Sequence, residues 1–220
     1  NDNLSKTPLG IGWGISGLSK LNKQSSGAVL VTDGSGKTVR YIQEGSNNPS
    51  LYFDGNDYIL RGNLPSLYPH SIEFWMLLDA TRVNNAGIAG IGPAGGGCGL
   101  GSVIRERSDG RVYQHIDPAG CGGHGASYIA TSPISSVWTH FAGTYDGVNH
   151  KVYINGLLVG EDTASYTSST NFVLGTDAFA FRRGYIRGFI DEVKIWDHAR
   201  TQAQVQANIQ TSLNGDESGL

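Results

Sequence analysis

The chain has 220 residues, of which 16% are charged, and its formal net charge is −3. It has no basic run that could neutralise phosphates, which argues against nucleic acid as a partner, and no apolar run near the roughly 18 residues that cross a bilayer. Its 32 glycines and 10% aromatic residues favour many short strands joined by tight turns over disorder.

The first 48 residues differ from the rest of the chain. Two β-rich runs, 28–32 and 37–42, flank Asp33-Gly34-Ser35-Gly36, a pattern that predicts a β-hairpin. Residues 46–50, with the sequence SNNPS, are typical of a linker. We therefore expect an N-terminal extension over 1–48, a main domain over 49–214 and a tail over 215–220. Because the chain starts at Asn1 without a signal peptide, we also expect it to be a fragment of a longer protein.

From residue 51 onward the pattern is a succession of strands. In 71–78, Ile72, Phe74, Met76 and Leu78 alternate onto one face. Hairpin turns are predicted at Asp109-Gly110 and at Asn155-Gly156, and long strands over 137–145 and 185–196.

The pattern of a helix occurs only near the end of the chain. Thr201 is its expected N-cap, and Gln204 completes a capping box. Trp75, Trp138 and Trp196 are expected in the core. The fold class predicted is all-β, an antiparallel two-sheet sandwich with one short C-terminal helix.

Five motifs in a fixed order resemble a known family. They are LYFDGNDYIL (51–60), SIEFWMLLD (71–79), WTHFAGTYDG (138–147), KVYINGLLV (151–159) and GFIDEVKIWDHARTQAQVQANI (188–209). This series is similar to the laminin-G-like jelly-roll domains of the concanavalin A-like lectin/glucanase superfamily. The resemblance implies a jelly-roll sandwich in a secreted or cell-surface protein that binds glycans or other proteins, often with calcium, and usually without catalysis. The segments GIGWGISGLSKL and DGSGKTVRYI resemble Rhs/YD-repeat bacterial surface proteins.

A calcium site is the first candidate. The Asp54-Gly55-Asn56-Asp57 turn offers the oxygen ligands that Ca²⁺ prefers, and Asp191 lies in an apolar strand where a carboxylate needs a partner. The resemblance implies that Asp54 and Asp191 lie close together and hold a structural metal. The alternative is that Asp54 caps its own turn and Asp191 accepts hydrogen bonds from the backbone or an arginine.

The two cysteines are the second candidate. A two-residue turn at Asp109-Gly110 would place Cys98 directly opposite Cys121, close to disulfide reach. A disulfide would indicate an oxidising compartment. Two unrelated buried thiols, or a zinc site made with His115 and His124, are the alternatives.

A glycan-binding face is the third candidate. Arg105 and Arg107 alternate on one strand of the central hairpin, and Tyr113 and His115 alternate on the other. Nearby loops add His124, Tyr128, Arg182, Arg183 and Tyr185. Guanidinium groups beside aromatic rings would suit an acidic sugar, because arginine binds carboxylates in a bidentate manner. The alternative is an ordinary solvated sheet face.

Catalysis finds little support in the sequence. No strand carries carboxylates at a spacing of two residues, as the glucanases of this fold class require, and Asp191 and Glu192 are adjacent and so point to opposite faces. We therefore expect a non-catalytic binding module for a glycan, with calcium. The alternative is a structural or adhesive protein–protein domain of a bacterial surface protein.

Overall fold

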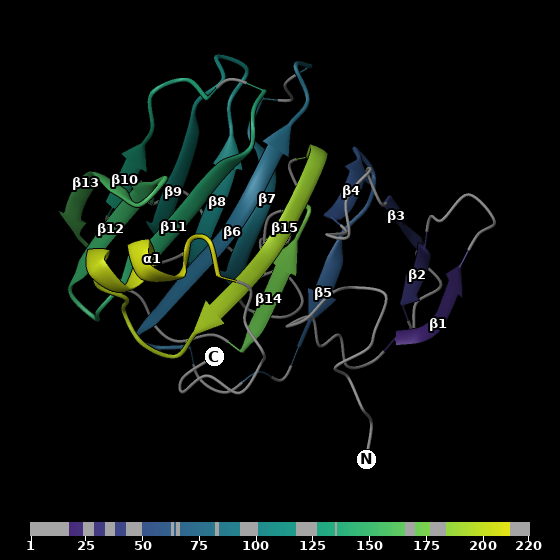
Figure 1. The fold of residues 1–220 in the computed structure, drawn as a ribbon. Coiled ribbons are helices and arrows are strands. Elements are labelled where there is room, and N and C mark those ends of the chain that lie inside the picture. Colours follow the sequence, from purple (N-terminus) through teal and green to yellow (C-terminus); the bar gives the residue numbers. More distant parts are fainter. Residues whose placement is uncertain are drawn as a thin grey trace.

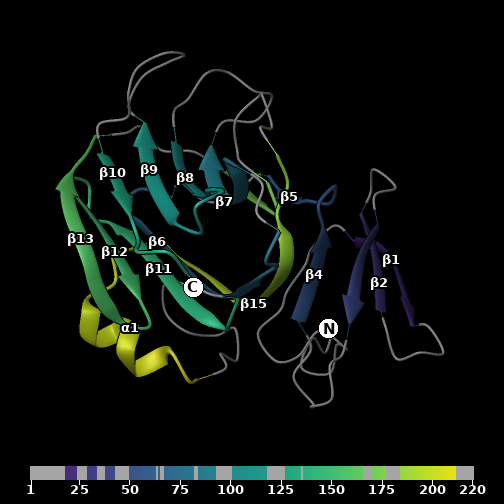
Figure 2. The ribbon, with the colours of Figure 1, turned by 90° about the horizontal axis from the view of Figure 1, so that it is seen from above.

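The computed structural model describes residues 18–23, 29–33, 38–42, 50–62, 64, 67–81, 84–92, 101–117, 127–134, 136–165, 170–176 and 184–211. Two antiparallel sheets pack face to face, and a short helix lies on the outside of the larger sheet (Figures 1 and 2). The predicted fold class, a two-sheet jelly-roll β-sandwich with one short C-terminal helix, is confirmed. Within the described residues, no helix combines the length and apolarity needed to cross a membrane.

The larger sheet has nine strands in the order β1-β2-β3-β4-β15-β6-β11-β12-β13. In that order they span Leu18–Lys23, Val29–Asp33, Thr38–Ile42, Ser50–Asp54, Arg187–Trp196, His70–Leu78, Thr139–Tyr145, Asn149–Ile154 and Leu157–Thr163. The first three strands belong to the N-terminal extension, and β3 pairs with β4. The extension therefore continues the larger sheet beyond β4.

The smaller sheet has six strands in the order β10-β9-β8-β7-β14-β5. They span Ser127–Ala130, Val112–Asp117, Gly101–Glu106, Ala86–Gly92, Asn171–Leu174 and Ile59–Arg61. The isolated residue Tyr185 also pairs with Gly87 of β7 and with Thr176 just after β14.

The core lies between the two sheets and follows the predicted alternation. Ile72, Phe74, Met76 and Leu78 of β6 are all buried, as their spacing predicts. The ring of Phe74 stacks on that of Phe141 from β11, with centroids 5.4 Å apart. Ile104 and Val112 of the smaller sheet complete the opposite wall. Burial of this apolar surface is the main stabilising term of such a sandwich.

The side chain of Gln114 crosses the space between the sheets. Gln114 of β9 is fully buried, and its Nε2 donates to the Ser102 hydroxyl at 2.6 Å. Its side-chain carbonyl occupies the space that a Cβ at Gly143 of β11 would need. The missing side chain at Gly143 therefore makes room for Gln114.

The C-terminal helix α1 spans Gln202–Asn208 and begins as predicted. The Thr201 side chain accepts from the Gln204 backbone N–H, and the Gln204 side chain accepts from the Thr201 backbone N–H. Val205 is the buried residue of the helix and packs on Ala142 and Tyr153. The helix thus covers the outer face of the nine-stranded sheet over β11 and β12 (Figure 1).

Candidate functional site

A row of residues runs across the outer face of the six-stranded sheet. Directly opposite residues of neighbouring strands point to the same face of a sheet. Tyr185 pairs with Gly87, Gly87 with Arg105, and Arg105 with Tyr113. We call these four residues, together with Tyr58 beside Tyr185, the tyrosine row.

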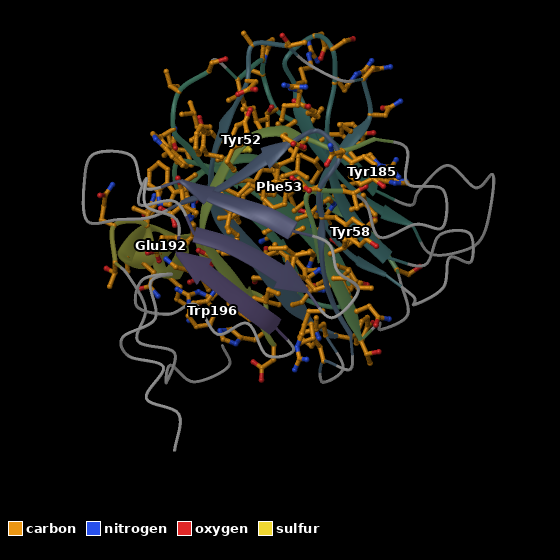
Figure 3. The ribbon with its side chains drawn as sticks, turned by 90° about the vertical axis from the view of Figure 1, so that its right-hand side faces the viewer. Tyr52, Phe53, Tyr58, Tyr185, Glu192 and Trp196 are labelled. Carbon is orange, nitrogen blue, oxygen red and sulfur yellow. The ribbon has the colours of Figure 1, made fainter. Side chains whose placement is uncertain are left out.

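The two tyrosines at one end of the row are half-buried, and their ring centroids lie 6.3 Å apart. Figure 3 shows Tyr58 and Tyr185 on one side of the sandwich, with Glu192 and Trp196 on the opposite side and Phe53 between them. Tyr185 is held by hydrogen bonds of its neighbours: Gly87 donates to the Gly184 carbonyl at 3.3 Å, and Ile186 donates to the Gly175 carbonyl at 3.1 Å.

The other end of the row is less accessible. Arg105 is 6% exposed and Tyr113 is 5% exposed. The Tyr113 hydroxyl donates to the Asn85 side-chain carbonyl at 3.0 Å, and Asn85 has a left-handed backbone with φ of 63°. Gly87 contributes no side chain between Tyr185 and Arg105, which lie two strand spacings, roughly 10 Å, apart. The row therefore places a buried guanidinium two strand spacings from a partly exposed pair of rings.

The other predicted ligand-binding residues are only partly brought together. His115 shares the outer face but lies in the next row, opposite Val103. Arg107 lies at the β8–β9 turn, where its Nε is 3.8 Å from Asp109 Oδ2 in an exposed ion pair. His124 and Arg183 lie outside the described residues.

Asn85, Gly87 and Tyr58 were missed by the sequence analysis. Tyr58 approaches Tyr185 through a ring contact and Gly87 through an isolated bridge, and both join segments far apart in the chain. The positive φ of Asn85 is a local feature that its Asn-Asn sequence could have suggested, because asparagine tolerates that conformation.

The two predicted calcium ligands do not meet. Asp54 lies opposite Arg187 on β15, whereas Asp191 lies four residues further along that strand, about 13 Å away. The close approach expected for Asp54 and Asp191 is therefore wrong, because the β4–β15 register separates them. Among the described residues, no three acidic, histidine or cysteine side chains gather into a metal-binding group.

Each of these carboxylates has a local partner. Asp54 Oδ1 accepts from the Asn56 backbone N–H at 3.2 Å, and Asp191 Oδ1 accepts from the Glu192 N–H at 2.8 Å. Burial raises the pKa of the Asp191 carboxyl to about 6, because removal from water disfavours its charged form. These contacts match the alternative in which both residues have local structural roles.

The register of the β8–β9 hairpin also differs from the prediction. Glu106 pairs with Val112, Arg107 N–H donates to the Arg111 carbonyl, and Gly110 has φ of 83°. The loop therefore has three residues, with Gly110 in the left-handed position that such loops use. This shifts the ladder by one residue, so the register argument for Cys98 opposite Cys121 is wrong. Both cysteines lie outside the described residues, and their pairing stays a prediction.

A buried polar layer lies between the nine-stranded sheet and the C-terminal segment. Glu73 of β6 is fully buried, and its carboxylate oxygens lie 3.7 Å from Arg200 Nε and 3.7 Å from His140 Nε2. Burial raises the pKa of Glu73, while Arg200 and Lys194 act in the opposite direction. Burial lowers the pKa of His140 to about 3, so this imidazole is neutral at pH 7.

The same layer holds the end of the chain in place. Lys194 Nζ donates to the carbonyls of Asn208 and Thr211 at 3.0 and 3.1 Å, and Arg200 stacks over the Trp196 ring. These groups are shielded from solvent and bind parts of the same chain. The arrangement positions α1 and offers no open face to a substrate.

A laminin-G family model, described as the concanavalin A-like lectin/glucanases superfamily, matches residues 53–206. The match runs from β4 into α1 and covers more than half of the chain. The chain belongs to the concanavalin A-like lectin/glucanases superfamily. A search of curated protein sequences returned no significant match.

Solved structures of other proteins share the fold of this superfamily member. Domain 4 of the extracellular arabinanase AbnA from Geobacillus stearothermophilus, in complex with arabinotriose, is 20% identical with a TM-score of 0.58, over 80% of this chain and 82% of that one. The CBM40 domain of the Ruminococcus gnavus IT-sialidase, bound to α2,3-sialyllactose, is 13% identical with a TM-score of 0.59, over 72% and 95%. The SAP-like pentraxin of Limulus polyphemus is 16% identical with a TM-score of 0.59, over 78% and 86%.

Proposed function

We propose that this domain is a non-catalytic carbohydrate-binding module and that the tyrosine row is its binding face. The observation that carries the proposal is the row itself, in which the paired rings of Tyr58 and Tyr185 share a sheet face with Arg105, two strand spacings away. Aromatic rings offer a flat apolar surface to a sugar, and a guanidinium recognises carboxylates or hydroxyls through several N–H groups. None of the four paired positions of the row is a carboxylate, which fits binding without hydrolysis.

Two of the structurally similar domains of other proteins support a sugar as the ligand. The arabinanase domain was solved with arabinotriose and the Ruminococcus domain with sialyllactose. Arg105 favours a sugar that carries a carboxylate, because that group can bind guanidinium in a bidentate manner. We propose that the domain acts outside the cell, where such polysaccharides are met.

A glycan array followed by titration calorimetry tests this function. We expect the wild type to bind defined soluble glycans, and Tyr185→Ala and Tyr58→Ala each to weaken binding at least about tenfold, a loss of about 1.4 kcal/mol. Tyr68→Ala is the matched control, because Tyr68 is 43% exposed and lies outside the tyrosine row. Arg105→Lys keeps the charge but removes the planar fork, so it should weaken acidic glycans more than neutral ones. If Tyr185→Ala, Tyr58→Ala and Arg105→Lys all bound glycans as tightly as the wild type, the assignment of the tyrosine row would be wrong.

Calcium is a separate proposal centred on the Asp54 turn. The carboxylates of Asp54 and Asp57 and the amide of Asn56 supply oxygen atoms of the kind calcium uses. A bound ion would raise the melting temperature in excess calcium relative to excess chelator, and Asp54→Asn would remove the difference. An identical melting temperature in both buffers would remove the metal from this domain.

A disulfide between Cys98 and Cys121 is also proposed and fits an extracellular location. Non-reducing mass spectrometry of a tryptic digest should show the two peptides linked. Labelling of two free thiols in the unfolded protein would show instead that the disulfide is absent.

A protein-binding role is the second candidate, and one observation favours it. β13 is the edge strand of the nine-stranded sheet, and Leu157, Leu158 and Val159 are 64%, 46% and 39% exposed. An exposed apolar edge can pair with a strand of another chain, here a second copy. Sedimentation should then show concentration-dependent association that Leu158→Lys abolishes. A monomer at all concentrations would contradict this role.

A further inference from the structure

A second row of aromatic side chains crosses the opposite side of the sandwich, on the outer face of the nine-stranded sheet. Tyr52 of β4 pairs with Phe189 of β15, and Phe189 pairs with Leu77 of β6. Thr139 pairs with Met76, so Trp138 continues the row beside Leu77. We call Tyr52, Phe189, Leu77 and Trp138 the aromatic platform. It spans four adjacent strand positions, roughly 14 Å across the sheet.

The rings of the platform are in contact with one another and partly open to solvent. The centroids of Tyr52 and Phe189 are 4.8 Å apart, and those of Phe189 and Trp138 are 6.4 Å apart. Trp138 is 42% exposed, whereas Tyr52, Phe189 and Leu77 are half-buried. The expectation that Trp138 belongs to the core is therefore wrong, although Trp196 is buried as predicted. Trp138 lies just before β11, at a position that points away from the core.

The platform has a polar border on one side. In the next row toward the β4–β5 turn, Asp54 lies opposite Arg187, and Arg187 Nε is 3.8 Å from Asp79 Oδ2. The stem of Arg187 lies against Gly55. These exposed groups offer two carboxylates and one guanidinium beside the rings. Their combined charge is negative, so they would repel an acidic ligand.

The other side of the platform is closed by the C-terminal segment. Trp75, in the adjacent row, donates from Nε1 to the Ile209 carbonyl at 3.1 Å. The residues that follow α1 therefore cover this ring, and the exposed aromatic surface ends there. What remains is a narrow strip with an apolar floor and hydrogen-bonding groups along one edge.

We propose that the aromatic platform is a second binding site, for a neutral polysaccharide chain. The apolar C–H face of a sugar ring packs on aromatic rings, and its hydroxyl rim needs donors and acceptors at the side. The platform and its Asp54–Arg187–Asp79 border present these two features next to each other. The negative border separates this ligand from the acidic sugar that Arg105 favours on the opposite face. Two sites on opposite faces would let one domain cross-link two polysaccharide chains, and would raise avidity where both chains belong to the same particle.

The test is co-sedimentation with insoluble neutral polysaccharides, namely cellulose, chitin and a β-1,3-glucan. We expect the wild-type chain to bind at least one of them. Trp138→Ala and Phe189→Ala should each weaken the affinity for that polysaccharide at least about tenfold. Trp138→Phe keeps a ring and should retain most of the binding. The binding should change little in high salt, because it does not depend on charge attraction.

Val148→Ala is the matched control, since Val148 is 59% exposed between β11 and β12 and lies outside the platform. Tyr185→Ala should bind the insoluble polysaccharide normally, which keeps this site separate from the tyrosine row. The melting temperature of each variant excludes loss of folding as the cause. Two outcomes would overturn the proposal: wild type that binds none of the three polymers, or Trp138→Ala and Phe189→Ala that bind as wild type. Association of the chain with itself that Trp138→Ala abolishes, without polysaccharide binding, would instead show a protein-binding face.

Discussion

The nine-stranded sheet separates two buried layers of very different chemistry. On its inner side, Phe74, Phe141 and their neighbours pack against the six-stranded sheet in an apolar core. On its outer side, beneath the C-terminal segment, Glu73, Lys194 and Arg200 form a layer of charged groups. Apolar packing is non-directional and depends mainly on buried area, whereas a buried charge requires its particular partner. We infer that the core sets the stability of the sandwich, and that the polar layer sets where the last helix lies.

The largest effect is expected from the core. Phe141→Ala removes a fully buried ring that stacks on Phe74, and should lower the free energy of unfolding by about 3–5 kcal/mol. Urea denaturation would measure it, and all regions should lose protection together in hydrogen exchange. Val148→Ala, at a residue that is 59% exposed, should change stability by less than about 0.5 kcal/mol. If Phe141→Ala lost hydrogen-exchange protection only in α1, the core would not set the stability of the whole sandwich.

A substitution in the polar layer should destabilise mainly the C-terminal helix. Glu73→Gln leaves the charge of Arg200 buried without its carboxylate partner, at a cost of roughly 2–4 kcal/mol. Hydrogen exchange should rise first in Gln202–Asn208, while β6 and β11 keep their protection. If exchange instead rose evenly over both sheets, the polar layer would be part of the same cooperative unit as the core.

Acid should weaken both layers. Burial lowers the pKa of His70 to about 4 and that of His140 and His150 to about 3. Below pH 6.5 the unfolded chain binds protons that these folded imidazoles do not, so stability is complete above pH 6.5 and falls toward pH 4. Each histidine contributes roughly 1 kcal/mol of this loss between pH 7 and pH 5.5. Urea denaturation at several pH values would measure the slope.

The inner and outer histidines can be separated. His140 belongs to the polar layer, whereas His70 and His150 lie on the inner side of the sheet, opposite Tyr145. His140→Gln should remove about one third of the pH dependence. Glu73 and Asp191, whose pKa values are raised, act in the opposite sense, because protonation favours their folded form. A stability that increases from pH 7 to pH 5.5 would show that these carboxyls dominate.

A smaller effect than those at Phe141 and Glu73 is expected at Asp191. Its folded pKa of about 6 lies above its ordinary value, so its charge destabilises the folded chain above pH 6. Asp191→Asn should therefore stabilise by about 1–2 kcal/mol at pH 7.5, and the gain should disappear below the ordinary pKa of aspartate, near pH 4. The asparagine carbonyl can still accept the Glu192 N–H. Destabilisation at pH 7.5, together with a lost response to calcium, would make Asp191 a metal ligand after all.

Local patterns predicted the parts of the fold that depend on neighbouring residues. Asn155 and Gly156 have the positive φ values, 49° and 76°, that their turn requires, and Thr201 caps its helix. Arg105 and Tyr113 share a face, as their alternation suggested. The one-residue shift at Gly110 was missed, because Asp-Gly suits both two- and three-residue loops.

Features that depend on distant pairings could not be predicted in this way. The separation of Asp54 from Asp191 follows from the register between β4 and β15, and the meeting of Tyr185 with Gly87 joins distant segments. The exposure of Trp138 depends on where β11 begins. The polar layer was missed because Glu73 occupies an outward position of β6, which looks like a solvated one until α1 is in place.

The contact between Gly143 and Gln114 constrains which substitutions this domain can accept during evolution. The Gln114 side chain fills the space in which a residue at 143 would begin its own side chain. A larger residue at 143 therefore requires a shorter one at 114. Among homologues of this chain, the two positions should change together, and such paired changes would record the contact in sequence alone.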